Sequence, residues 1–452
     1  MLLLRAAVVA CTALLLVFPL LYAQDAQSVA AASRYAREAA AAREAADPET
    51  MRARLLDALE LLPGHPTLLH DLAVAHALAG DVTAAASTLE RLAAMGLVYD
   101  LAQDDDLAAL RSRPELQAVQ ARFHRNADRI GDGDPAFRLP DRDFIPEGVA
   151  FDARTRRFFV GSVHLRRIVA VDSAGTATVF GAVATDSEGS DAAASAPTSR
   201  FGADPSNALW SVLGIAADTE RRLLWVCTAA LPETRGVAEE ELRRSRVVAY
   251  DLDTGALRGT YAVSDTLRHV IGDLAIGPEG EVYVSASDGA IYVIGQGSSA
   301  LEPLVPAGRF VSPQGIVAWP DGRRLYVADY ALGILHIDPA SGATSPVTAP
   351  EDAMLLGIDG LARHDDTLIA IQNGTRPHRV LRLRLNAAGD AITAAETLEA
   401  NHPAYDEPTL GTVVEDTLFY VANSQWGAFR DGALPPADEL EAPVILRLRL
   451  KR

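Results

Sequence analysis

The chain has 452 residues, of which 60 are acidic and 41 are lysine or arginine, and its net charge is −19 at pH 7. This charge argues against a nucleic-acid partner, because the neutralisation of phosphates requires basic patches, and it can raise the local concentration of cations. Lys451 is the single lysine of the sequence, so chemistry that needs a lysine Schiff base or a lysine general base is effectively excluded.

Residues 1–23 have the pattern of a signal peptide. Arg5 precedes an apolar run that is short for a membrane span, and Ala23 is a small residue suited to cleavage. An uncleaved N-terminal anchor is the alternative. No later apolar run is long enough to cross a bilayer, and the excess of arginine over lysine suggests a bacterium of high genomic GC content. We therefore expect a periplasmic or secreted protein with no membrane span in the mature chain.

The two cysteines limit the possible chemistry. Cys11 lies in the signal segment, so Cys227 is the only cysteine expected in the mature chain. An internal disulfide and a thiolate metal site are both excluded. Cys227 lies in an apolar strand pattern, where the role of a small buried hydrophobe is expected.

Residues 24–130 are predicted to form an all-α domain. The stretch is rich in alanine, leucine and arginine and has helical periodicity. Residues 65–96 resemble a tetratricopeptide repeat, with Gly80 at the turn between two helices and Pro63 at the end of the preceding helix. Such a module can dock a peptide or protein partner, or it can be a cap packed on the next domain. The sequence leaves both open.

Residues 131–143 are rich in glycine, proline and aspartate and are interpreted as a linker, followed by a β-propeller over residues 144–452. Six stretches after residue 145 repeat one pattern, a strand that opens on a turn, a short turn and a second strand. One position of this pattern recurs at steps of 66, 60, 41, 45 and 50 residues, which suits propeller blades. These positions are Glu147, Leu213, Asp273, Gln314, Asp359 and Thr409.

The fold class is therefore mainly β, a six-bladed propeller with an N-terminal all-α, tetratricopeptide-like domain. The last strand, residues 444–450, is expected to close the ring beside residues 137–144, which removes exposed sheet edges. Seven blades, with one hidden in the polar segment 184–207, are the alternative.

Ring closure brings equivalent positions of all blades together around one axis. The ring would then gather Glu147, Asp273 and Asp359, with the amide of Gln314 beside them. Carboxylates this close in a partly desolvated channel must take up protons or share a cation. Oxygen donors without cysteine suit a hard ion, and calcium accepts irregular geometry more readily than magnesium. Acids before glycine also serve as turn formers, which is the alternative for each residue alone.

The three motifs that carry Glu147, Gln314 and Asp359 resemble those of the senescence-marker-protein, gluconolactonase and luciferin-regenerating-enzyme superfamily. The similarity covers about residues 140–450. It implies a calcium ligand at Glu147 in PEGVAFD, a ligand at Gln314 in PQG, and a ligand and general base at Asp359 in IDG. Gln314 departs from the asparagine of the family, and Asp273 is an extra acid in a motif closer to strictosidine-synthase-like and NHL-type propellers.

The resemblance implies a divalent-metal-dependent hydrolase of a lactone or similar cyclic ester, with calcium as the expected cation. The cation would polarise the carbonyl and Asp359 would activate water. The substrate-binding candidates lie in loops that leave the strands at the same mouth, and they are His164, Asn373, Arg376, Asn423 and Trp426. Asn373 and Asn423 occupy matching positions in the fifth and sixth repeats.

Two other functions stay open. A non-catalytic propeller can bind a ligand or a protein while the helical module recruits a second partner. A strictosidine-synthase-like enzyme is the third possibility. The sequence has no G-x-S-x-G elbow, zinc-protease spacing or phosphate loop, which argues against those classes of enzyme.

Overall fold

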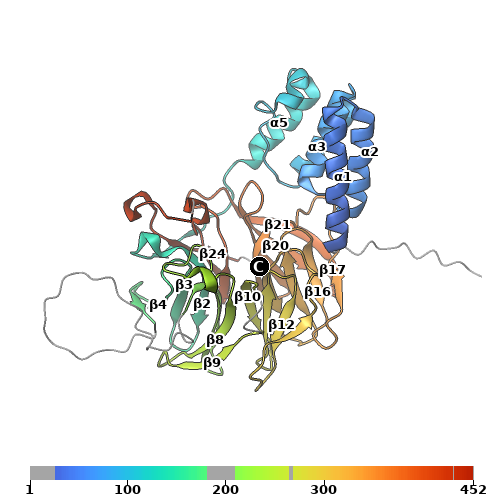
Figure 1. The fold of residues 1–452 in the computed structure, drawn as a ribbon. Helices are drawn as coiled ribbons and strands as arrows, with labels where there is room; N and C mark the ends of the chain where they lie inside the picture. The colour runs from blue at the N-terminus through green and yellow to red at the C-terminus, as the bar shows by residue number, and fades with distance from the viewer. Residues whose placement is uncertain (1–25, 181–208, 264–267, 431, 451–452) are drawn as a thin grey trace, which may run out of the picture.

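The computed structural model describes residues 26–180, 209–263, 268–430 and 432–450. The expected signal peptide and the polar segment 184–207 therefore lie outside the described residues. The described chain forms a propeller with a helical module on one side of its upper face (Figure 1). No helix of this part of the chain has the length and apolar character needed to cross a membrane.

The propeller consists of six four-stranded antiparallel sheets within the described residues, which confirms the predicted fold class. The first three blades contain β2 (Pro146–Asp152), β3 (Arg157–Ser162), β4 (Ile168–Val171) and β5 (Ala177–Val179); β6 (Ser211–Asp218), β7 (Leu223–Ala229), β8 (Ser245–Asp251) and β9 (Leu257–Tyr261); and β10 (Ile271–Ile276), β11 (Val282–Ala286), β12 (Ile291–Ile294) and β13 (Glu302–Val305).

Blades four and five contain β14 (Pro313–Ala318), β15 (Leu325–Asp329), β16 (Gly333–Ile337) and β17 (Thr344–Pro346), then β18 (Ile358–His364), β19 (Thr367–Gln372), β20 (Arg379–Leu385) and β21 (Ile392–Ala400). Blade six joins β22 (Gly411–Val414), β23 (Thr417–Val421) and β24 (Val444–Arg449) to β1 (Asp134–Arg138). Short 3-10 turns lie at Arg142–Phe144, Glu239–Glu241, Trp426–Ala428 and Ala437–Glu439.

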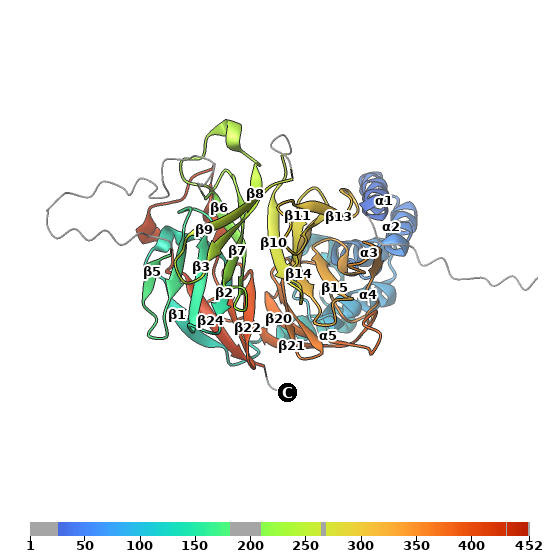
Figure 2. The ribbon, with the colours of Figure 1, turned by 90° about the horizontal axis from the view of Figure 1, so that it is seen from below.

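The ring closes through the pairing of the two ends of the propeller. β1 runs antiparallel to β24, with Phe137 opposite Ile445, as the sequence predicted for this segment. β1 lies inside the stretch that was interpreted as a linker. Each inner strand contacts the next one around the ring, in the order β2, β6, β10, β14, β18 and β22. The ring is completed by the contact of β22 with β2. Figure 2 shows the sheets arranged around the centre.

The helical module contains α1 (Ala26–Glu44), α2 (Pro48–Leu61), α3 (Pro66–Leu78), α4 (Val82–Ala94), the 3-10 helix Asp105–Leu110 and α5 (Pro114–Asn126). Its small apolar residues let the helices pack in sequential pairs. Asp47 and Asp81 cap the N-termini of α2 and α4, and each accepts a hydrogen bond from a backbone N–H of the first turn. This arrangement agrees loosely with the tetratricopeptide-like prediction.

The module is fixed to blades four and five. Its apolar core continues into the propeller through Leu332 and Met354. The buried Arg379 of β20 donates from Nη1 to the carbonyl oxygen of Met95 at 2.8 Å, and the backbone N–H of Val98 donates to the carbonyl oxygen of Arg376 at 2.9 Å. The loop after α4 therefore lies directly over the loop that leads into β20.

Candidate functional site at the propeller mouth

A β-bulge places the repeated position of each of the first five blades. The register between the first two strands shifts between Pro146 and Val149, between Val212 and Ile215, between Ile271 and Leu274, between Pro313 and Ile316, and between Ile358 and Gly360. Each shift spans one of the residues predicted to ring the axis. A bulge bends the strand and redirects a side chain that the regular alternation would place elsewhere.

Glycine follows the repeated position in several blades because the inner strands approach closely there. A Cβ on Gly214 would lie 2.6 Å from Oδ1 of Asp273, and a Cβ on Gly360 would lie 2.5 Å from the carbonyl oxygen of Thr409. Each of these glycines thus makes room for the ring position of the next blade. The missing side chain permits the close packing of the inner strands at the ring positions.

Glu147 of β2 is held at the mouth by one hydrogen bond to its carboxylate. Nε1 of Trp426 donates to its Oε2 at 2.7 Å, and its backbone carbonyl accepts from Oγ1 of Thr409 at 2.8 Å. Burial raises the pKa of Glu147 well above its ordinary value, and the negative charge of Asp359 raises it further. The bond from Trp426 opposes this shift, because it favours the charged form.

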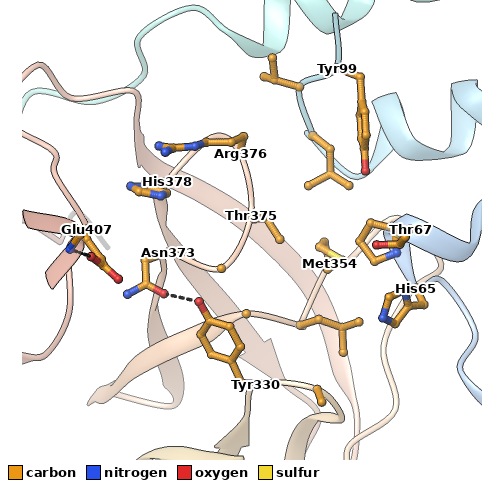
Figure 3. Close-up of a pocket in the computed structure, with 18 of the residues that line it drawn as sticks. His65, Thr67, Tyr99, Tyr330, Met354, Asn373, Thr375, Arg376, His378 and Glu407 are labelled. Carbon is orange, nitrogen blue, oxygen red and sulfur yellow. Dashed lines mark hydrogen bonds between the residues drawn. The ribbon is translucent and has the colours of Figure 1, made fainter. Parts of the chain in front are cut away.

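Asp359 of β18 is the second carboxylate of the mouth. Nδ2 of Asn373 donates to its Oδ2 at 2.6 Å, and the Tyr330 hydroxyl donates to Oδ1 of Asn373 at 2.9 Å, which fixes the amide (Figure 3 shows the Asn373–Tyr330 pair). Burial raises the pKa of Asp359 to about 6, opposed by the bond from Asn373. The group is therefore mostly ionised at neutral pH and can accept a proton.

Asp273 of β10 faces a different part of the channel. It lines a narrow cavity of 170 Å³ together with apolar residues of the inner strands, and its Oδ2 accepts from the backbone N–H of Ile316 at 3.3 Å. Burial raises the pKa of Asp273 to about 7. Its charge still reaches Glu147. It is thus an acid of the channel that is coupled electrostatically to the mouth.

The remaining ring positions contribute less. Leu213 and Thr409 are buried, and Thr409 bonds the backbone of Glu147. The Gln314 side chain donates from Nε2 to Oγ of Ser312 at 3.0 Å, so it is directed along its own strand entry. Its amide oxygen is the part that is left for another partner.

Within the described residues, the three carboxylates have no positive partner. No basic side chain is among the groups that shift the pKa values of Glu147, Asp273 and Asp359. Oxygen donors without a counter-charge fit a hard divalent cation, and Glu147 and Asp359 each keep one carboxylate oxygen clear of the bonds described above. The described residues hold no group of three or more histidine, cysteine, aspartate or glutamate side chains placed to bind one ion. A cation here would therefore need amide, backbone or water oxygens as well.

A cleft of 730 Å³ opens beside these acids, between the propeller and the helical module (Figure 3). Asn373, Arg376 and Glu407 line it from the propeller, and His65 and Tyr99 line it from the module. Asn373 and Arg376 thus line the cleft and Trp426 bonds Glu147, and their role as substrate-binding residues stays a prediction.

Glu407 is an acid of the cleft that the sequence analysis did not select. Burial raises its pKa, and Arg376 opposes the shift. It stands two residues before the ring position Thr409, in the stretch DEPTL, so an acid next to a ring position was the available signal. Its charge raises the pKa of both Glu147 and Asp359.

Two predicted substrate residues lie away from these contacts. Nδ1 of His164 lies 2.7 Å from the carbonyl oxygen of Glu233, and its Nε2 accepts from Nε of Arg235 at 3.2 Å, in a separate cleft of 590 Å³. Asn423 is buried; its Oδ1 accepts from the N–H of Val444 at 2.7 Å, and its Nδ2 donates to the carbonyl oxygen of Ala442. The structure therefore does not bring His164 or Asn423 to Asp359, and Asn423 connects the entry to β24.

The chain is similar to solved structures at low sequence identity. No family model and no curated protein matches the chain. Among solved structures, a glucose dehydrogenase from Thermus thermophilus is 14% identical, with 70% of this chain and 99% of that chain covered and a TM-score of 0.46. A gluconolactonase from Xanthomonas campestris is 15% identical over 71% and 100% of the chains, with a TM-score of 0.44. A luciferin-regenerating enzyme is 11% identical over 70% and 95%, with a TM-score of 0.44.

The expected similarity to gluconolactonase and luciferin-regenerating enzymes is found, at identities that describe the fold alone. The chemistry of this chain has to be argued from its own residues.

Proposed function

We propose that the chain is a divalent-cation-dependent hydrolase of a lactone or similar cyclic ester. One observation carries the proposal: Glu147 and Asp359 are half-buried carboxylates at the same mouth, with raised pKa values and no basic partner among the described residues, beside a cleft large enough for a small molecule. Perturbed acids of this kind are costly to bury and occur preferentially at functional sites.

Glu147 and Asp359 would hold the cation, with Gln314 as a source of an amide oxygen. A bound divalent cation, with calcium as the best candidate, supplies a Lewis acid for the carbonyl and for the oxyanion that forms from it. The rest of the chemistry belongs to the chain. Asp359 takes a proton from water as the water oxygen bonds to the carbonyl carbon. The ring C–O bond then breaks, and the leaving oxygen takes up a proton.

The contacts of Asp359 suit this role. Asn373 fixes one carboxylate oxygen, and Tyr330 fixes the amide of Asn373, so the other oxygen has a defined direction. Without a cation, burial raises the pKa of Asp359 to about 6, which makes it a stronger base than an exposed aspartate and leaves it mostly ionised at pH 7. Trp426 performs the equivalent positioning for Glu147.

The test compares the wild type with Asp359→Asn and Glu147→Gln, and with Asp366→Asn as the charge-matched control on the exposed turn of the same blade. We expect calcium to raise the melting temperature of the wild type and the control, because a ligand that binds only the folded state stabilises it. We expect hydrolysis of aldonolactones to be lost in Asp359→Asn. Calcium-independent melting of the wild type together with no turnover on any lactone would contradict the proposal, and ligand binding without turnover would favour the non-catalytic propeller.

We further propose that the protein is exported, on the basis of the composition of residues 1–23. Mass spectrometry of the mature N-terminus after expression in a bacterial host tests this. Cleavage after Ala23 and recovery from the periplasm are expected, and an intact N-terminus in the cytoplasmic fraction would contradict it.

A further inference from the structure

The cleft beside the mouth has two walls from different domains. Blades five and six supply Asn373, Thr375, Arg376, His378 and Glu407, and the entry to α3 and the loop after α4 supply His65, Thr67 and Tyr99 (Figure 3). The buried bond from Arg379 to Met95 and the backbone bond from Val98 to Arg376 hold the second wall against the first. The helical module is therefore a fixed part of the cleft.

Unpartnered polar atoms gather in this cleft. Oγ1 of Thr375, Nδ1 of His378 and Nδ1 of His65 are buried, and none has a hydrogen-bond partner in another described residue. A buried polar group without a partner costs about 1–3 kcal/mol, so three in one cleft indicate that a ligand or water satisfies them. These atoms are shielded from solvent in the chain without a ligand, and the residues that carry them line both walls of the cleft.

The charges of the cleft select the kind of ligand. Arg376 is exposed in the cleft, and within the described residues it forms no salt bridge. Burial lowers the pKa of His65, and it lowers that of His378 to about 4 with a further contribution from Arg376, so both rings are neutral at pH 7. Neutral imidazoles and a threonine hydroxyl suit ligand hydroxyls. A single arginine beside two acids of the cleft, Asp406 and Glu407, suits one carboxylate better than a phosphate dianion.

We propose that the helical module completes a substrate site for a hydroxyl-rich lactone that carries a carboxylate. Arg376 binds the carboxylate, and His65, Thr375 and His378 bind hydroxyls. The lactone carbonyl then lies toward Asn373 and Asp359, on the mouth side of the cleft. This inference rests on the proposed hydrolase activity and adds the substrate class and the role of the module as a specificity wall.

The first experiment uses two lactones that differ in one group. D-Glucaro-1,4-lactone has a carboxylate where D-glucono-1,4-lactone has a hydroxymethyl group. We expect the wild type to favour the first lactone by about tenfold or more in kcat/KM, as one charge-assisted contact provides. Arg376→Gln should remove that preference through KM. Arg384→Gln, an exposed arginine of β20 outside the cleft, should keep it. Equal preference in the wild type and Arg376→Gln would overturn the inference.

The second experiment tests the wall from the helical module. His65→Ala should raise KM for both lactones several-fold and leave kcat unchanged, because His65 contacts substrate hydroxyls away from the reacting carbonyl. His76→Ala, on α3 outside the cleft, is the control and should behave as the wild type. Unchanged KM in His65→Ala would show that the module takes no part in binding.

Calorimetry with D-glucarate separates this inference from the hydrolase proposal. Binding to the wild type and its loss in Arg376→Gln, with no lactone turnover, would support the cleft and contradict the hydrolase. Turnover of lactones with no preference for the carboxylate would keep the hydrolase and overturn the inference.

Discussion

Asn373 donates a hydrogen bond of 2.6 Å to Asp359 while its own amide oxygen accepts one of 2.9 Å from Tyr330. The amide thus has a fixed orientation, with its N–H directed at the carboxylate. A donor in this position stabilises the charged form of Asp359 and opposes the effect of burial. The relationship connects the wall of the cleft to the proposed base.

Asn373→Ala should therefore move the pH dependence of hydrolysis. Without the donor, the pKa of Asp359 rises above about 6. The base is then protonated at higher pH, and we expect the acidic limb of the kcat profile to move up by about one pH unit. Activity lost at pH 6 to 7 should return near pH 8.

Asn423→Ala is the matched control for this prediction, because it removes the equivalent amide of blade six. Asn423 bonds only backbone groups near β24. Its loss should reduce stability by about 1–3 kcal/mol and leave the acidic limb in place. A limb that stays in place in Asn373→Ala would contradict the role given to this amide.

The buried acids should also make stability depend on pH when divalent cations are removed. Asp359 has an ordinary pKa of 3.8 and a folded value of about 6, so the folded chain binds this proton more tightly than the unfolded chain does. The contribution of Asp359 to the free energy of unfolding is complete below pH 4. About 3 kcal/mol of it is lost as the pH rises from 4 through 6. In Asp359→Asn this loss is absent.

Buried histidines such as His378 shift stability in the opposite direction between pH 4 and 6.5, so the difference between wild type and Asp359→Asn is the quantity to measure. In EDTA, urea unfolding should show the variant gaining on the wild type from about pH 4 to pH 6.5, with little further change above. Millimolar calcium should restore the wild type. A difference that is constant across this range would be evidence against an Asp359 whose pKa is raised by burial.

The repeated sequence pattern predicted the blades and their ring positions because every blade meets the same physical demand. Four of the inner strands have a glycine, such as Gly214 or Gly360, where they approach the next blade, and that demand recurs along the chain. The positions of Glu147 and Asp359 follow from it.

Other features of the site were not predictable in this way. Glu407 lies in one blade only, so no repeat marks it. Asn423 and Asn373 have matching sequence positions, yet Asn423 bonds the backbone near β24, a partner that depends on the length of the loop before that strand. The placement of His65 and Tyr99 depends on how two domains dock, and periodicity within one domain contains no information on docking.

Trp426→Phe should weaken calcium binding in a pH-dependent way. The change keeps an aromatic ring and removes the N–H that bonds Glu147 at 2.7 Å. Without this donor the pKa of Glu147 rises further, and protons compete more strongly with the cation. We expect a calcium dissociation constant about 3–10 times higher at pH 7, with recovery at pH 9, measured by chelator competition. Trp319 lies elsewhere, in blade four, so the calcium dissociation constant of Trp319→Phe should match that of the wild type. An equal rise of the dissociation constant at pH 7 and at pH 9 in Trp426→Phe would refute the explanation.

Gly96→Ala should loosen the wall that the helical module contributes to the cleft. Gly96 has a φ of 74°, and a Cβ there would lie 2.6 Å from Nη1 of Arg379. The arginine cannot move aside freely, because it donates to Met95 at 2.8 Å and to Gln372 at 2.6 Å.

Gly80→Ala is its matched control. Gly80 has a φ of 79°, and a Cβ there would meet nothing within 4 Å. Both variants bear the left-handed backbone strain of about 1–2 kcal/mol. Only Gly96→Ala also disturbs Arg379, so we expect it to lose about 2 kcal/mol more in the free energy of unfolding, as breaking a buried charged hydrogen bond does.

The coupling between the two residues supplies the decisive measurement. In an Arg379→Met background the excess cost of Gly96→Ala should largely disappear, since the group it displaces is gone. Gly96→Ala alone should raise KM for the lactones, because Gly96 positions the loop that carries Tyr99. It should change kcat little, because Asp359 and Asn373 lie on the propeller. Equal losses of stability in Gly80→Ala and Gly96→Ala would show that Arg379 does not fix the module to the propeller.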